Sequence, residues 1–242
     1  MKKNHAERSL SIKVIIPAYN EEESIPLVIA DIPKIVDEII VVSNNSTDNT
    51  EANAKNAGAT VLVENRKGYG YACLKGMSYI ASASLNNQTK RPDIIVFLDG
   101  DYSDYPEELT KIVAPIIDDN IDFVIGARDK NLREAGSMTG PQIFGNWLAT
   151  SLMKLFFRST FTDLGPFRAI KYDKLLALDM EDKTYGWTVE MQLKVLKKKF
   201  SYREIPVNYR NRIGVSKVSG TVKGAIFAGV KILTWIFKYS FK

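Results

Sequence analysis

The chain has 242 residues, of which 45% are hydrophobic and 25% charged, so it can bury a sizeable core without disulfide or metal staples. Its single cysteine, Cys73, excludes an internal disulfide, and its single histidine, His5, argues against a histidine base or a Ser-His-Asp triad. The net charge of +5 is modest, and neither an internal repeat nor a low-complexity tract is visible.

The first ten residues are predicted to form a flexible polar tail, and the absence of an apolar run behind its lysines gives no indication of a signal peptide. Short β-branched runs then alternate with helical patterns. Five runs are predicted to be strands, at residues 11–19, 37–43, 59–64, 93–99 and 121–127. The apolar residues in each run are nearly continuous and do not alternate with polar ones, which is typical of strands covered on both faces. This alternation of strand and helix predicts an α/β fold with a doubly wound, mostly parallel sheet.

Three polar loops directly follow predicted strands: Pro17-Ala18-Tyr19-Asn20, Ser43-Asn44-Asn45 and Asp99-Gly100-Asp101. Ligands of doubly wound sheets bind outside the carboxyl ends of the strands, so we expect these loops to converge on one site. Two aspartates around a glycine could hold Mg²⁺, which prefers oxygen ligands, whereas an ordinary acidic turn is the alternative. Asn45 is expected at positive φ, and a turn with a helix cap explains its neighbours equally well.

Two glycines, Gly68 and Gly70, open a helical pattern in the stretch 65–76. The third glycine of a dinucleotide-binding fingerprint is missing and the stretch does not follow the first strand, so that reading is excluded. A basic residue and free amides at a helix start could still bind a phosphate.

The pattern changes after about residue 130. A loop at 135–140 precedes a helix at roughly 142–157, and a helix near 187–199, a strand near 201–207 and a basic loop follow. We expect this half to form the wall of an acceptor site. From Lys194 to Lys217 it carries eight Lys or Arg residues against one acid, Glu204, which predicts an anionic partner. The block lacks the interleaved aromatic residues of a stacking platform, so nucleic acid is not expected.

Residues 221–242 form a strongly apolar segment interrupted by Lys223, Lys231 and Lys238. No uninterrupted run of about 20 apolar residues exists, so a spanning helix is not predicted. Lysines on one side, with Trp235, Phe237, Tyr239 and Phe241, favour an amphipathic helix lying in a membrane interface. The alternative is a helix packed on the core of its own domain or on a second subunit.

Several motifs occur in an order that resembles glycosyltransferase family 2. They read VIIPAYNEEESI, VVSNNSTDNT, NRKGYGYACLKGM, FLDGDYSDYPEEL, DLGPFRAI, YGWTVEMQLK and NYRNRIGVSKVSG. The likeness covers residues 12 to about 220 and is closest to polyprenyl-phosphate sugar transferases of the dolichyl-phosphate mannose synthase kind. It implies a GT-A-type nucleotide-diphospho-sugar transferase fold for residues 11–220.

The resemblance also implies roles for individual residues. The donor, a UDP- or GDP-sugar, would be bound by Pro17, Ala18, Tyr19, Glu21, Ser43, Asn44, Lys67, Gly68 and Asp99. Asp99 and Asp101 would hold a divalent cation, Mg²⁺ or Mn²⁺. Arg210, Arg212 and Lys217 would contact phosphates. The acidic pair usual after the second strand is Ser43-Asn44 here, so the base of the nucleotide stays open.

The implied reaction displaces a nucleoside diphosphate from a sugar with inversion, and a cation would stabilise the leaving charge. A polyprenyl phosphate acceptor is already ionised and needs no base. A saccharide or lipid hydroxyl would need one, and Asp163 and Glu190 are the candidates, although a turn and a helix surface explain them equally well. A binding module without catalysis is the third possibility. The expected location is the cytoplasm, peripheral on the inner face of the membrane.

Overall fold

The computed structural model describes residues 10–86, 88–214 and 222–240. One mixed sheet runs through it in the order β3-β2-β1-β4-β6-β5-β7. Its strands are β1 (Ile12–Ala18), β2 (Glu38–Ser43), β3 (Thr60–Val63), β4 (Ile94–Phe97), β5 (Phe123–Arg133), β6 (Arg168–Lys171) and β7 (Tyr202–Tyr209). Only β6 runs against its neighbours, between β4 and β5. The doubly wound, mostly parallel sheet is thus confirmed.

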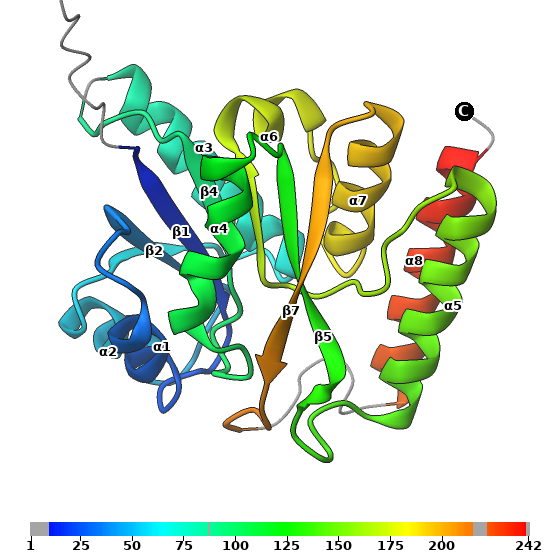
Figure 1. The fold of residues 1–242 in the computed structure, drawn as a ribbon. Helices are drawn as coiled ribbons and strands as arrows, with labels where there is room; N and C mark the ends of the chain where they lie inside the picture. The colour runs from blue at the N-terminus through cyan, green and yellow to red at the C-terminus, as the bar shows by residue number, and fades with distance from the viewer. Residues whose placement is uncertain (1–9, 87, 215–221, 241–242) are drawn as a thin grey trace, which may run out of the picture.

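Helices cover both faces of this sheet (Figure 1). One face carries α1 (Ile25–Asp31), α2 (Thr50–Asn56), the short helix η1 (Pro106–Glu108) and α4 (Leu109–Asp118). The other carries α3 (Tyr69–Leu85), α6 (Tyr172–Leu178) and α7 (Trp187–Lys197), with α5 (Gly140–Phe157) and α8 (Val222–Ser240) outside them. Ile15 of β1 packs in one core and its neighbours Val14 and Ile16 pack in the other, so the strand is buried on both faces, including at Lys13.

Helices α5 and α8 pack side by side at the edge of the molecule, where α8 also contacts α7 (Figure 1). The buried side of α8 includes Trp235, whose indole nitrogen donates to Asp182 Oδ2 at 2.6 Å. The prediction that Trp235 lies at a membrane interface is therefore wrong, because a buried carboxylate binds its polar atom. Lys231 is 3.2 Å from the same carboxylate. Phe241 lies outside the described residues, and no helix of the described part is long and apolar enough to cross a membrane.

The turn after β2 has the backbone that its sequence predicts. Asn45 adopts φ 66°, a conformation that asparagine tolerates better than most residues, so this prediction is confirmed. The turns after β1 and β4 likewise contain residues at positive φ, Asn20 and Tyr102. These sharp turns bring three loops to one edge of the sheet.

Candidate active site

A cleft of about 500 Å³ opens at the carboxyl ends of β1, β2 and β4. The structure brings ten of the sequence-predicted residues into its lining: Pro17, Ala18, Tyr19, Glu21, Asn44, Lys67, Gly68, Asp99, Asp101 and Arg212. The same lining includes residues of α5 and α8 on the opposite side. The cleft is therefore bounded by the sheet edge and by the outer helix pair, and its volume lies within the range of about 300–1,000 Å³ that is usual for ligand pockets.

The two aspartates of the D-G-D turn are held differently. Asp101 is buried, its Oδ2 lies 2.8 Å from Arg212 Nη1, and its Oδ1 accepts from the Ser103 amide at 3.0 Å. Asp99 Oδ1 accepts the Tyr69 hydroxyl at 2.9 Å. Burial, together with the charge of Asp101, raises the pKa of Asp99 to about 6. Both carboxylates line the cleft together with Arg212, which offsets the charge of Asp101.

The residues fit a cation that keeps part of its coordination for water and phosphate. Within residues 10–86, 88–214 and 222–240 no three acidic, cysteine or histidine side chains are arranged to hold a metal ion by themselves. Mg²⁺ is typically bound by one or two carboxylates plus waters and substrate phosphates. Asp99 and Asp101 supply that number of carboxylates and no more.

The glycine loop beside the cleft is fixed by Asn44. Its side-chain amide donates to the carbonyls of Glu64 and Arg66 at 3.1 and 2.7 Å, and its oxygen accepts the Gly68 amide at 2.8 Å. A Cβ on Gly68 would lie 2.2 Å from the Lys183 carbonyl, and one on Gly70 would lie 2.1 Å from that of Asp182. Glycine is needed at both positions because another loop crosses them this closely.

Other predicted residues lie away from the cleft. Ser43 is fully buried and donates to Glu51 at 2.8 Å, on the side of the sheet that α2 covers. Arg210 stacks 3.4 Å over the ring of Tyr102 and donates to main-chain carbonyls rather than facing the cleft. Lys217 lies outside the described residues. The proposed contacts of Ser43 with a base and of Arg210 with phosphates have no support in this arrangement.

Glu190 is also absent from the cleft lining. It is fully buried, and its carboxylate accepts the amides of Glu181 and Asp182 at 2.8 Å each, with Lys194 at 2.8 Å. The carboxylate thus binds two amides of the turn before α7 and the ammonium group of Lys194. A base must reach the acceptor, and Glu190 has no exposed surface from which to do so.

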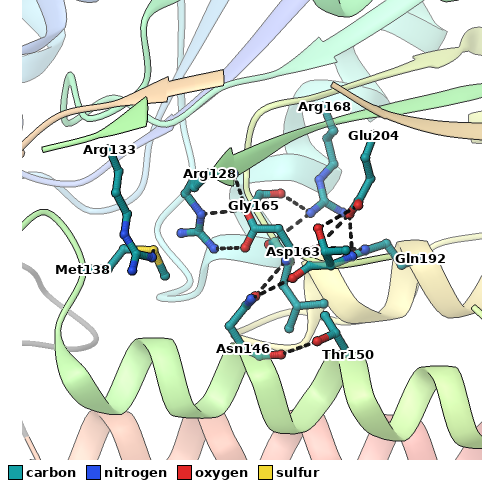
Figure 2. Close-up of polar contacts among 12 residues, drawn as sticks. Arg128, Arg133, Met138, Asn146, Thr150, Asp163, Gly165, Arg168, Gln192 and Glu204 are labelled. Atoms are coloured by element: carbon teal, nitrogen blue, oxygen red, sulfur yellow. Dashed lines mark hydrogen bonds and ion pairs between the residues drawn. The ribbon is translucent and has the colours of Figure 1, made fainter. Parts of the chain in front are cut away.

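A second cavity, of about 300 Å³, adjoins the first and shares Arg128 with it. Asp163 lies in its wall and forms a two-point ion pair with Arg128, at 2.8 and 2.7 Å (Figure 2). Burial by itself would raise the pKa of Asp163, but the charge and hydrogen bonds of Arg128 outweigh it and hold that pKa below its ordinary value. A carboxylate held in this way is a weak proton acceptor.

Arg133 is the second arginine of this cavity. Its guanidinium contacts Met138 Sδ at 3.3 Å (Figure 2), and it makes no ion pair with any residue of the described ranges. Sequence reasoning missed both arginines. Arg128 directly follows the predicted strand 121–127, so the strand-end rule that found Asp99 could have found it as well.

Comparison with known proteins places this arrangement in a family. The model described as Glycosyl transferase family 2 matches residues 13–177. An uncharacterized glycosyltransferase of Mycobacterium tuberculosis is 33% identical over 90% of this chain and 94% of its own. A dolichyl-phosphate hexose transferase of Haloferax volcanii is 30% identical over 88% and 89%. A crystal structure of glucosyl-3-phosphoglycerate synthase from Mycobacterium tuberculosis, with Mn²⁺, UDP and glucosyl-3-phosphoglycerate, superposes with a TM-score of 0.73 at 21% identity, covering 95% of this chain and 80% of that one.

Proposed function

The chain belongs to glycosyltransferase family 2, and we propose that it transfers a sugar, with inversion, from a UDP- or GDP-sugar to the phosphate of a polyprenyl phosphate. The observation that carries this proposal is the pairing of two cavities across Arg128. One is lined by the carboxylates and glycine loop expected of a donor site, and the other presents an unpaired arginine among the described residues. Two anionic substrates would meet between them.

The donor would occupy the larger cleft. Asp99 and Asp101 would hold a divalent cation, Mg²⁺ or Mn²⁺, which stabilises the negative charge on the departing diphosphate. Arg212, 2.8 Å from Asp101, would lie beside the same diphosphate. The glucosyl-3-phosphoglycerate synthase that shares this fold was crystallised with Mn²⁺ and UDP, which agrees with these roles.

The acceptor phosphate would enter the smaller cavity. Arg128 is largely neutralised by Asp163, whereas Arg133 has its charge available for an anion. A phosphate monoester is mostly ionised at neutral pH, so it can attack without a base. The engagement of Asp163 by Arg128 and the burial of Glu190 favour such an acceptor over a hydroxyl group. The dolichyl-phosphate hexose transferase among the relatives bears a name consistent with this choice.

A lipid acceptor requires contact with a membrane, and the outer face of α5 suits it. Neither α5 nor α8 contains an Asp or Glu, although the chain has 28 acids in 242 residues. Five large apolar side chains of α5 are exposed. Phe156 packs against Phe237 of α8, and at 100° per residue the other four span about 120° of the helix: Ile143, Phe144, Trp147 and Leu155. Lys154 falls within the same arc by this spacing, and the exposed Arg158 directly follows the end of the helix.

This combination of apolar side chains and cations without acids is typical of a helix that rests in the headgroup layer of an anionic bilayer. Gly145 and Asn146, on the same helix, line the donor cleft. A lipid phosphate lifted from the bilayer beside α5 would therefore have a short path to the sugar. We propose that the enzyme acts in the cytoplasm, peripheral on the inner face of the membrane.

The test is a transfer assay with purified protein, radiolabelled UDP- and GDP-sugars and a short-chain polyprenyl phosphate, with and without a chelator. Label should move to the organic phase only when metal is present, and Arg133→Gln should raise the KM for the acceptor while leaving that for the donor unchanged. Arg203→Gln, at an exposed surface ion pair, is the matched control. Label in a saccharide or in phosphoglyceric acid would contradict the lipid acceptor, and no transfer to any acceptor would indicate a binding module.

A further inference from the structure

Asp182 is a buried carboxylate that belongs to the lining of neither cavity. Its Oδ1 accepts the main-chain amides of Thr184 and Gly186 at 2.7 and 3.0 Å, which closes the turn before α7, residues 182–186. Its Oδ2 accepts the indole N–H of Trp235 at 2.6 Å and lies 3.2 Å from Lys231 Nζ. Both of these partners are on α8, so one carboxylate joins the turn to that helix.

The two segments that Asp182 joins are walls of the donor cleft. The turn and the start of α7 contribute four residues to the lining: Thr184, Tyr185, Trp187 and Thr188. Helix α8 contributes Gly229 and Ile232. The shape of the cleft on this side therefore depends on how the turn and α8 are held relative to each other.

The same turn is also bound to the glycine loop, by bonds of a different kind. Two amides at the start of α3 donate to its carbonyls, Gly70 to Thr184 at 3.3 Å and Tyr71 to Lys183 at 3.1 Å. These are main-chain bonds and do not use the Asp182 side chain. Loss of the bond to α8 would therefore release the turn on one side only and leave it attached to the glycine loop.

The contact with α8 is specified by a glycine as well as by the carboxylate. A Cβ on Gly186 would lie 2.4 Å from the indole nitrogen of Trp235 and 2.5 Å from Asp182 Oδ2. Any side chain at position 186 would thus push the indole off the carboxylate. The bond itself is charge-assisted, and such bonds are about twice as strong as those between neutral groups. It fixes the direction of approach as well as the distance.

We propose that Asp182 is a positioning residue for sugar transfer: by binding Trp235 it holds the turn before α7 in the orientation that aligns the sugar of the donor. This inference rests on the proposed function, in which loops at the strand ends bind the nucleotide. The wall built by the turn and α8 lies across the cleft from those loops. Misplacement of reacting groups by about 1 Å can lower a rate about 100-fold. Loss of the Trp235 bond should therefore lower kcat and leave nucleotide affinity unchanged.

The experiment compares wild type with Trp235→Phe, which keeps an aromatic ring but removes the N–H donor. Tyr79→Phe is the matched control, because it removes an aromatic donor to a carboxylate, Glu38 at 2.8 Å, at the amino end of β2 and outside both cavity linings. Binding of UDP and GDP is measured by calorimetry, and transfer by the assay described above, at a temperature well below the melting point of each variant.

Trp235→Phe should bind the nucleotide with the wild-type Kd and lose about 10- to 100-fold in kcat. Tyr79→Phe should melt below wild type and keep both the Kd and kcat. Asp182→Asn should lower kcat as well, because its amide cannot accept every bond of the carboxylate. If Asp182 acts through Trp235, the double variant should be no slower than the slower single one, whereas losses that multiply would contradict the proposal.

The outcomes separate this inference from the proposed function. A wild-type kcat in Trp235→Phe would overturn the role of Asp182 alone, and a wild type that transfers no sugar would overturn both. If Trp235→Phe does not fold, Lys231→Gln is measured in the same way, since it removes the partly exposed partner of the same oxygen. A kcat that falls at unchanged nucleotide Kd would then support the proposal, and an unchanged kcat would overturn it.

Discussion

Replacing Asp163 with Asn tests whether this carboxylate is a catalytic base or the partner of a buried cation. The side chains of Arg128 and Asp163 are 12% and 6% exposed, and they share two side-chain hydrogen bonds. Removing one partner of a buried pair costs about 3–5 kcal/mol, because the remaining charge stays buried without compensation. At about 3 °C per kcal/mol for a chain of this size, Asp163→Asn should melt roughly 10 °C lower.

The matched control is Asp119→Asn, which makes the same chemical change at an exposed pair. Asp119 and Arg203 are 52% and 43% exposed, and such pairs contribute at most about 1 kcal/mol. Urea unfolding of wild type, Asp163→Asn and Asp119→Asn, followed by circular dichroism, gives the free energy of unfolding that each substitution removes. If Asp163→Asn is as stable as wild type but has lost turnover, this reasoning is refuted and Asp163 is again the candidate catalytic base.

The difference in stability between wild type and Asp163→Asn should depend on pH in a definite direction. The pKa of Asp163 is lowered in the folded protein, so the stability that its pair provides is present above the unfolded pKa of about 3.9. It is lost as pH falls through the lower folded pKa. The stability gap between wild type and Asp163→Asn should therefore be constant from pH 7 to about 5 and close below about pH 4. A gap that widens on acidification would contradict this assignment.

Three further changes have expected results. Gly70→Ala places a Cβ 2.1 Å from a backbone carbonyl. The clash costs about 1–3 kcal/mol and exceeds the gain in helix propensity of about 1 kcal/mol. The free energy of unfolding should therefore fall, and the KM for the donor should rise. Gly140→Ala, in open space, is its control and should be neutral or slightly stabilising. Glu190→Gln should lower the free energy of unfolding by about 3 kcal/mol without changing nucleotide affinity in calorimetry, since Lys194 loses a buried partner. Vesicles with anionic lipid should shift the fluorescence of Trp147, 59% exposed, to shorter wavelength; neutral vesicles should not, and Trp147→Ser should abolish the shift.

The sequence located the cleft well because parallel strands end at one edge of a sheet. Asn44, Asp99 and Asp101 were each found as the polar residues at the end of an apolar run, and all three line the cleft. Ser43 satisfied the same rule but faces away, since neighbouring residues of a strand point to opposite faces and its hydroxyl meets Glu51. Strand ends thus predict the position of a loop more securely than the direction of a side chain.

What the sequence could not supply was the packing between distant segments. Trp235 belongs to a pattern typical of an interfacial helix, and only the position of Asp182, 53 residues earlier, explains its burial. Strand β6 has four residues and lies antiparallel between two strands that precede it in the chain, so no local signal specifies its place. The family resemblance implied that Arg210 binds phosphate, whereas its guanidinium stacks on two tyrosine rings, those of Tyr102 and Tyr105.

The three hydrogen bonds of Asn44 limit how this enzyme could be re-engineered. Two donors and one acceptor of a single amide join the end of β2 to the loop before α3. An aspartate at this position would place carboxylate oxygens against the carbonyls of Glu64 and Arg66, and repulsion would open the loop. A change of nucleotide preference at position 44 would therefore require residues 64–68 to be exchanged with it as one unit.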